Sequence, residues 1–229
     1  MACEIIVIIP AFNEEKSVSK VISHIPKNLV SEIVVVNNNS SDKTSINATA
    51  AGATVISEPR QGYGFACLKG IEYVLLKTKR PDIIVFIDAD YSDHPEEITK
   101  LLSPILDQDY DLVIGSRVLG KRAKGSMTPQ QIFGNWLATA LLKVMYKITY
   151  TDLGPFRAIR FDKLIDMAMK DQTYGWTVEM QLKAAKMKMK VCEVPVTYRK
   201  RIGKSKISGT LKGTIMAGYK IIITIFKYA

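Results

Sequence analysis

Ile83-Ile84-Val85-Phe86-Ile87-Asp88-Ala89-Asp90 is the stretch that decides the fold. Its first five residues are β-branched or aromatic, which predicts a fully buried strand, and two carboxylates one residue apart follow directly. Ligands of open α/β sheets bind outside the carboxyl ends of the strands, so Asp88 and Asp90 stand where a site would form. Their oxygens suit Mg²⁺ or Mn²⁺ carrying a diphosphate. The alternative for a lone Asp-x-Asp is a helix cap or a turn.

Strands and helices alternate on both sides of this stretch. Pro10 is expected to end the first strand, and Asn13 to cap a helix that runs to about Ile25. Further helices are expected after residue 42, from about 65 to 79 and after residue 95. The alternation predicts an α/β fold with a doubly wound, mostly parallel sheet flanked by helices. Four more strands, mostly apolar runs typical of strands covered on both faces, are expected at 4–9, 32–36, 53–56 and 111–117.

The second half of the chain changes character. It is expected to contain a basic loop (118–128), a long apolar helix (129–148), an irregular turn (151–157), a helix beginning at Trp176 and a strand (191–198). The last helix, 207–228, is amphipathic at 100° per residue, with lysines on one arc and apolar residues on the opposed arc. Core packing is the plain interpretation of that helix, and a position on a membrane surface is the alternative.

Charge is divided unequally along the chain. Residues 1–115 carry 10 basic and 16 acidic side chains, whereas residues 116–229 carry 22 basic and 6 acidic ones. The basic half lacks the aromatic interleaving of a nucleic-acid module, so nucleic acid is not expected as a partner. Phosphate-bearing substrates or an anionic membrane surface fit this charge.

Cysteine usage and hydropathy bear on location. Cys3, Cys67 and Cys192 are odd in number and far apart, which predicts neither a disulfide framework nor a zinc site and favours a reducing setting. The N-terminus lacks the features of a signal peptide, and no uncharged apolar stretch reaches membrane-spanning length. We therefore expect a cytoplasmic protein, with the last helix available for peripheral contact at the inner face of the cell membrane.

Seven motifs, taken in order, resemble those of the family 2 glycosyltransferases of GT-A fold, and particularly the dolichyl-phosphate-mannose-synthase-like branch. The resemblance covers nearly the whole chain. It implies one domain, 1–229, with a nucleotide-sugar-binding half at 1–117 and an acceptor-binding half at 118–229. The motifs are Pro10-Ala11-Phe12-Asn13-Glu14, the turn at 37–42, Arg60-Gln61-Gly62-Tyr63-Gly64, Asp88-Ala89-Asp90, Gly115-Ser116-Arg117, Gly154-Pro155-Phe156-Arg157-Ala158 and Arg201-Ile202-Gly203-Lys204-Ser205-Lys206.

The resemblance implies a UDP- or GDP-linked sugar as the donor, and a transfer that inverts the anomeric carbon. Asp88 and Asp90 would hold the Mg²⁺ or Mn²⁺ ion, with Asp90 as a catalytic residue. Many relatives carry an acid where this chain has Asn37, which leaves the nucleobase open. The residues implied in donor binding are Pro10, Ala11, Asn13, Glu14, Asn37, Asn39, Arg60, Gly62, Gly64, Asp88, Ala89 and Asp90.

The acceptor is implied less directly. A hydroxyl acceptor needs a general base, and Glu179 occupies the acidic position that follows the Gly-Pro-Phe-Arg turn in similar chains. The alternative for Glu179 is a helix-start acid that pairs with a nearby cation. A polyprenyl phosphate needs no base, because its phosphate oxygen is already ionised. Four basic residues are expected to bind an acceptor of this kind, namely Arg157, Arg199, Arg201 and Lys206.

Three functions agree with parts of this pattern. An inverting, metal-dependent glycosyltransferase, acting on a polyprenyl phosphate or on a lipid- or glycan-linked acceptor, agrees with all seven motifs. A sugar nucleotidyltransferase would need a glycine-rich, basic loop directly after the first strand, and the sequence has none there. A non-catalytic nucleotide- or RNA-binding protein is supported only by the basic half. The Gln-x-x-Arg-Trp motif of processive polysaccharide synthases is absent from the sequence.

Overall fold

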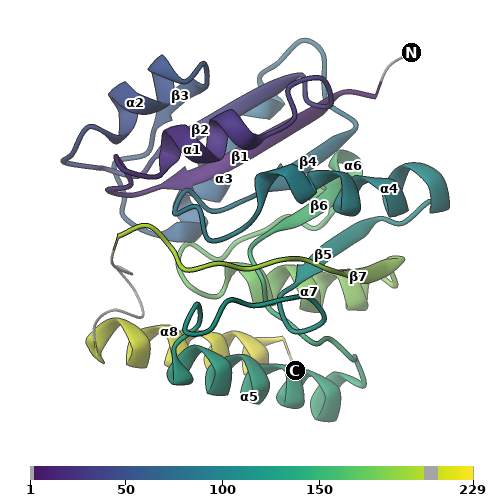
Figure 1. Ribbon diagram of the computed structural model, residues 1–229. Helices are drawn as coiled ribbons and strands as arrows, with labels where there is room; N and C mark the ends of the chain where they lie inside the picture. Colours follow the sequence, from purple (N-terminus) through teal and green to yellow (C-terminus); the bar gives the residue numbers. More distant parts are fainter. Residues whose placement is uncertain (1–2, 204–210, 229) are drawn as a thin grey trace.

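A seven-stranded sheet forms the centre of the computed structural model, which describes residues 3–203 and 211–228 (Figure 1). The order across the sheet is β3-β2-β1-β4-β6-β5-β7. Neighbouring strands are parallel except at β6, which runs antiparallel to β4 and β5. The expected α/β fold with a mostly parallel sheet is confirmed. The strands are β1 (Ile5–Ala11), β2 (Glu32–Asn37), β3 (Thr54–Ser57), β4 (Ile83–Phe86), β5 (Leu112–Ser116), β6 (Arg157–Arg160) and β7 (Val191–Pro195).

Helices cover both faces of the sheet. One apolar layer contains side chains of α1 (Val18–His24), α2 (Thr44–Ala50) and α4 (Ile98–Gln108), which follows the short 3₁₀ turn η1 (Pro95–Glu97). The opposite layer contains side chains of α3 (Tyr63–Leu75), α5 (Pro129–Tyr146), α6 (Phe161–Asp166), α7 (Trp176–Lys186) and α8 (Leu211–Lys227). Helices α5 and α8 pack against each other and lie side by side at the bottom of Figure 1.

The central strands are buried on both faces, which explains why their sequences do not alternate. Along β1, Ile5, Val7 and Ile9 pack in the layer of α1 and α4, whereas Ile6 and Ile8 pack in the layer of α3 and α7. Burying one such side chain stabilises the fold by roughly 1.5–3 kcal/mol. Both layers therefore hold β1 in place, and with it the residues that follow its carboxyl end.

Three local expectations were wrong. Pro10 does not end the first strand, because β1 continues to Ala11. The neighbouring β4 ends at Phe86, opposite Ile8, so the missing N–H of Pro10 removes no ladder hydrogen bond on that side. The predicted cap, Asn13, has a positive φ of 53°, and α1 begins only at Val18. The third miss is β6, since the sequence indicated only an irregular turn up to Arg157.

The topology fixes where a ligand can bind. The strand order reverses between β1 and β4, because β2 and β3 extend the sheet to one side of β1, and β6, β5 and β7 extend it to the other. In open α/β sheets the ligand binds at such a switch point, in a crevice outside the carboxyl ends of the strands. The segments that follow β1, β2 and β4 meet at this edge.

Candidate active site

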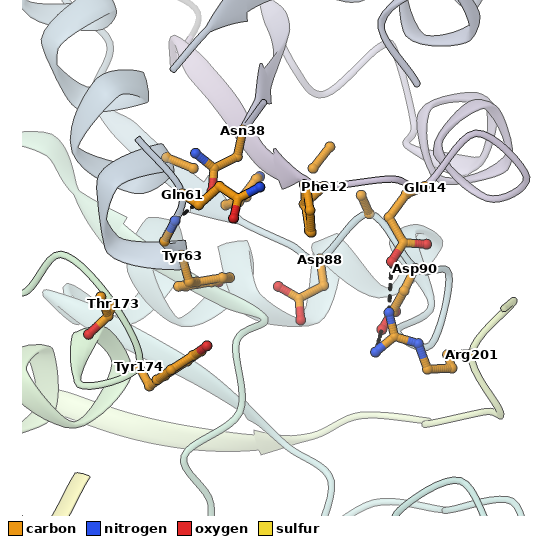
Figure 2. A pocket seen from close by; sticks show the side chains of 15 residues that line it. Phe12, Glu14, Asn38, Gln61, Tyr63, Asp88, Asp90, Thr173, Tyr174 and Arg201 are labelled. Atoms are coloured by element: carbon orange, nitrogen blue, oxygen red, sulfur yellow. Dashed lines mark hydrogen bonds and ion pairs between the residues drawn. The ribbon is translucent and has the colours of Figure 1, made fainter. Parts of the chain in front are cut away.

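A cavity of about 400 Å³ lies at this switch point. The end of β1 contributes Pro10 and Ala11, and the segment after β4 contributes Asp88, Ala89 and Asp90. Figure 2 shows the Asp88 carboxylate near the middle of the cavity, between the tyrosines of one wall and an acidic cluster with one arginine on the other. The position is the one that the Asp88-Ala89-Asp90 motif predicts.

Asp88 and Asp90 use their oxygens differently. Asp90 Oδ1 caps the turn, since it accepts hydrogen bonds from Ser92 N at 2.8 Å and from Ser92 Oγ at 2.5 Å. Asp90 Oδ2 instead faces Arg201, 3.1 Å from one guanidinium nitrogen. The buried Asp88 Oδ1 has no hydrogen-bond partner among the described residues. Burial, followed by repulsion from Asp90, raises the pKa of Asp88 to about 7. The turn-cap interpretation therefore applies to one oxygen of Asp90 and leaves Asp88 unexplained.

Arg201 reaches the cavity from a strap, residues 199–202, that follows β7. The backbone N–H groups of Arg199 and Ile202 donate to carbonyls of the turn after β4 at 2.9 and 3.0 Å, which holds the strap along that turn. The Arg201 guanidinium then lies between Glu14 Oε1, at 2.7 Å, and Asp90 Oδ2. Figure 2 shows these two contacts as dashed lines.

The charge of the cavity lining is predominantly negative. Among the described residues, the carboxylates of Glu14, Asp88 and Asp90 line it together with one positive charge, that of Arg201. A diphosphate would be repelled by this surface unless a cation came with it. The partnerless oxygen of Asp88 is the kind of group that Mg²⁺ or Mn²⁺ would satisfy. Such ions are usually held by one or two carboxylates together with substrate phosphates.

Gly62 and Gly64 lie where the loop 170–175 packs on the N-terminus of α3. A Cβ on Gly62 would lie 2.4 Å from Gln172 O, and one on Gly64 would lie 2.1 Å from Asp171 O. The N–H groups of Gly64 and of the next residue donate to carbonyls of the loop at 3.2 and 2.9 Å. The two glycines therefore admit a neighbouring backbone to this helix end, where the resemblance implies donor-binding residues. Of the two, only Gly62 lines the cavity.

The turn after β2 meets the cavity through Asn38, not through Asn37 or Asn39. The Asn38 amide is satisfied by backbone groups. Its nitrogen donates to two carbonyls of the loop after β3 at 3.1 and 2.6 Å, and its oxygen accepts from Gly62 N at 2.8 Å. Asn37 Oδ1 accepts from the backbone of its own turn, and Asn13 Oδ1 accepts from the same turn at 2.8 Å. These asparagines shape the loops around the cavity, and only Asn38 lines it.

Three arginines that were expected to bind ligand do not line the cavity. Arg60 is paired with Glu58 at 2.8 Å and does not line the cavity. The Arg199 guanidinium donates to two carbonyls of the 91–93 segment, which lies outside the cavity lining. Arg157 is fully buried and donates to the carbonyls of residues 154 and 177, so the expected contact with an acceptor phosphate does not fit its position. Lys206 lies outside the described residues.

Glu179 does not fit the role of a general base. Its side chain is 1% exposed and does not line the cavity. Its carboxylate accepts from Lys170 N, Asp171 N and Tyr228 Oη and pairs with Lys183 at 2.8 Å. Burial alone would raise the pKa of Glu179, but these hydrogen bonds, that from Lys183 first, lower it below its ordinary value. The second interpretation, a helix-start acid that pairs with a cation, describes this residue.

A second cavity, of about 290 Å³, adjoins the first and leads towards α5 and α8. Five residues line both cavities, namely Tyr63, Asp88, Asp90, Tyr174 and Arg201. Half of the remaining lining of the second cavity comes from α5 and α8, namely Gln130, Gln131, Gly134, Asn135, Gly218 and Ile221.

Arg117 is the second arginine of that cavity. Its guanidinium donates to Asp152 at 2.8 and 2.6 Å, and its side chain is only 11% exposed. A guanidinium offers five N–H groups in a fixed fork, so pairing with one carboxylate leaves donors for a second anion. Arg117 and Arg201 thus place two positive charges on the wall of the second cavity.

About half of the residues that line the first cavity had no role assigned from the sequence motifs. Tyr63 and Gln61 lie inside a motif that was recognised, but only its arginine and glycines were assigned a role. Thr173 and Tyr174 carried no signal, because they reach the cavity only through the packing of the 170–175 loop on α3. Arg117 stood in a recognised Gly-Ser-Arg motif without an assigned contact. Phe12, Asn38 and Ala66 complete the set of missed residues.

Fold and site together define the class of protein as a GT-A glycosyltransferase. Glucosyl-3-phosphoglycerate synthase of Mycobacterium tuberculosis, crystallised with Mn²⁺, UDP and phosphoglyceric acid, superposes on 99% of this chain and 78% of its own, with a TM-score of 0.79. The two sequences are 23% identical, so this similarity establishes the fold.

The chain belongs to glycosyl transferase family 2, whose model matches residues 6–167. An uncharacterized glycosyltransferase of Mycobacterium tuberculosis is 35% identical over 214 residues, which cover 92% of this chain and 93% of the relative. The undecaprenyl-phosphate mannosyltransferase of Micrococcus luteus is 31% identical over 222 residues, or 91% and 89% of the two chains. The resemblance to the dolichyl-phosphate-mannose-synthase-like branch is thereby confirmed, and a glycosyltransferase is favoured over the nucleotidyltransferase and binding-protein alternatives.

Proposed function

We propose that this enzyme is an inverting, metal-dependent glycosyltransferase that moves a hexose from a UDP- or GDP-sugar to a polyprenyl phosphate. The observation that carries the proposal is the junction of two cavities at Asp88 and Asp90. One cavity is acidic and suits a metal-bound diphosphate, and the other is lined by two arginines and leads between two helices. Donor and acceptor would therefore meet at the carboxylates.

Mg²⁺ or Mn²⁺, when bound, would neutralise charge on the donor diphosphate as it leaves. Asp88 and Asp90 are the residues that would hold the ion. Arg201, whose guanidinium lies 3.1 Å from Asp90 Oδ2, would turn to the donor phosphates, where a guanidinium stabilises developing negative charge. Tyr63 and Tyr174, which line both cavities, would hold the sugar between them and exclude water.

The transfer itself is a single displacement. A phosphate oxygen of the acceptor forms a bond to the anomeric carbon as the bond from that carbon to the donor's β-phosphate oxygen breaks, and the electron pair leaves with the nucleoside diphosphate. No proton has to be removed from an ionised acceptor phosphate. This agrees with Glu179, which lies outside both cavities and is engaged by four donors.

Arg117 would orient the acceptor phosphate, whereas Arg201, on the wall that the two cavities share, would face the donor phosphates. Each keeps a carboxylate partner, Asp152 for the first and Glu14 for the second. The wall formed by α5 and α8 is mixed: Gly134, Gly218 and Ile221 leave room for the first isoprene unit, and three amide side chains from α5 line the rest.

The deciding experiment is a thermal-shift panel of UDP-glucose, UDP-galactose, UDP-N-acetylglucosamine and GDP-mannose, each with Mn²⁺ and with a chelator. A ligand that binds only the native state raises the unfolding midpoint by mass action. We expect one donor to raise the midpoint in Mn²⁺ and not in chelator, and transfer to undecaprenyl phosphate to release nucleoside diphosphate. No shift with any donor, or release of pyrophosphate, would contradict the proposal.

The acceptor implies contact with a membrane surface. Among the described residues no helix is both long and apolar enough to cross a bilayer. Helices α5 and α8 nevertheless expose apolar side chains, each at least 40% accessible, namely Ile132, Phe133, Trp136, Val144, Met216, Tyr219, Ile223 and Phe226. Exposed basic residues follow or precede them in the chain, including Lys121, Arg122, Lys124, Lys143, Lys147 and Lys227. Apolar side chains with nearby positive charge suit peripheral binding to anionic lipid.

Removing the aromatic pair of α5 should weaken this contact. Phe133 and Trp136 are 60% and 61% exposed, with ring centroids 5.8 Å apart. The double variant Phe133→Ser, Trp136→Ser should bind phosphatidylglycerol vesicles at least tenfold more weakly in co-sedimentation, because two large apolar side chains no longer enter the bilayer. Leu76→Ser, which changes an 81% exposed leucine just after α3, is the control and should bind as wild type does. Equal binding by the double variant would exclude α5 from the contact.

A further inference from the structure

The loop 170–175 forms one wall of the donor cavity through Thr173 and Tyr174. Two of its carbonyls, those of Gln172 and Thr173, accept the backbone hydrogen bonds from the N-terminus of α3. Its interior is fixed by Asp171, whose Oδ1 accepts from Thr173 N at 2.8 Å and from Gly175 N at 3.0 Å. The position of Tyr174 therefore depends on how this loop is held from behind.

Glu179 holds the back of the loop. Its carboxylate accepts from Lys170 N at 3.0 Å and from Asp171 N at 2.6 Å. Hydrogen bonds from backbone amides to a buried carboxylate are among the stronger ones in proteins, and leaving such a group unsatisfied is costly. Glu179 is thus a positioning group for the cavity wall although it touches no part of the cavity.

Helix α8 and the residue that follows it, Tyr228, engage the same loop from the other side at positions spaced four apart. Lys220 Nζ lies 3.2 Å from Asp171 Oδ2, and Tyr228 Oη donates to Glu179 at 2.6 Å. Between them, Thr224 is buried against Gly175, where a Cβ would lie 2.4 Å from its hydroxyl. One face of α8 therefore clamps the loop, while the apolar residues at 219, 223 and 226 point to solvent.

We propose that Glu179 is a positioning residue that couples α8 to the donor cavity, so that the seating of α8 sets the affinity for the donor nucleotide. The inference rests on the proposed function, because the cavity must be the nucleotide site. Since coupling between sites is reciprocal, a donor that orders the 170–175 loop also favours the seated position of α8. The enzyme would then bind its donor best when α8 is in place beside the acceptor cavity.

Tyr228→Phe tests the coupling, and Tyr73→Phe is its matched control. Both variants remove one tyrosine hydroxyl that donates to a glutamate: Tyr228 Oη, just after α8, donates to Glu179, whereas Tyr73 Oη donates from α3 to Glu32, away from α8 and from both cavities. Calorimetric titration with UDP and with GDP, each in Mn²⁺, should show a three- to tenfold higher Kd for Tyr228→Phe and less than a twofold change for Tyr73→Phe. Both variants should lose some thermal stability, so stability alone would not separate them.

Amide exchange measured by NMR gives a readout that needs no nucleotide. The amides of Lys170 and Asp171 should exchange several-fold faster in Tyr228→Phe than in Tyr73→Phe, because Glu179 loses one of the two side-chain donors, Tyr228 and Lys183, that hold its carboxylate. An unchanged nucleotide Kd in Tyr228→Phe, together with unchanged exchange at these two amides, would overturn the coupling. Failure of the wild-type protein to bind either nucleotide would instead overturn the proposed function.

Discussion

Replacement of Asp90 by asparagine is expected to abolish Mn²⁺-dependent nucleotide binding while the protein remains folded. The amide oxygen can still accept the two hydrogen bonds from Ser92 that close the turn. The negative charge that faces Arg201, and that would hold the ion, is lost. Removing one partner of a buried charged contact costs about 2–5 kcal/mol, which corresponds to at least a 30-fold weaker affinity.

Calorimetric titration of Asp90→Asn with UDP and GDP in Mn²⁺ measures this loss, and circular dichroism checks the fold. Asp88→Asn should behave in the same way, because Asp88 lines the same cavity and would lose the charge that would hold the ion. Asp107→Asn, an exposed carboxylate on α4, serves as the control and should bind as wild type does. Undiminished affinity in Asp90→Asn would remove the metal-dependent donor site from the proposal.

Substitution of Arg201 by glutamine should have two opposite effects. In the protein without ligand this guanidinium is the cation that lies between Glu14 and Asp90. Without it, Mn²⁺ alone should bind about three- to tenfold more tightly, since the ion no longer competes with a partly exposed ion pair. Transfer should nevertheless fall about 100- to 1,000-fold, because a donor aimed at the developing charge is missing.

Electron paramagnetic resonance of free Mn²⁺ measures the first effect, and release of nucleoside diphosphate the second. Lys200→Gln is the matched control, because it removes an exposed positive charge from the same strap without touching either cavity. A loss of transfer without tighter Mn²⁺ binding would mean that Arg201 does not shield the metal site. Normal transfer in Arg201→Gln would exclude it from the phosphate contact.

Much of the fold was predictable because burial on both faces leaves a plain pattern. β1, β2 and β4 are continuous apolar runs, and each was placed within two residues at its start. β6 was not predictable in this way, since its four residues begin and end with arginine. Arg157 lies in the interior only because carbonyls of residues 154 and 177 receive its N–H groups. Those partners come together only in the folded protein.

The site residues also fall into those with a local sequence signal and those that depend on tertiary contacts. Asp88, Asp90, Pro10 and Ala11 line the cavity as expected, because they follow directly on strands whose carboxyl ends share one edge of the sheet. Residues that reach it through loop packing, such as Tyr174, had no local signal. Glu179 shows the converse, since an acid in the expected motif position turned out to bind backbone amides. The motifs predicted which part of the chain lines the cavity, but the contacts of each side chain could be known only from the folded structure.

The place of β6 between β4 and β5 has a consequence for synthesis of the protein. β4 and β5 are consecutive along the chain, yet they do not pair with each other, and both neighbours of β5 come from the last third of the sequence. A nascent chain that ended at residue 117 would hold β5 without either partner, and such unpaired strand edges favour aggregation. Residues 1–117 should therefore not mature ahead of the rest, and the cavity at the switch point, whose lining includes Tyr174 and Arg201, should form only when residues up to about 201 have left the ribosome.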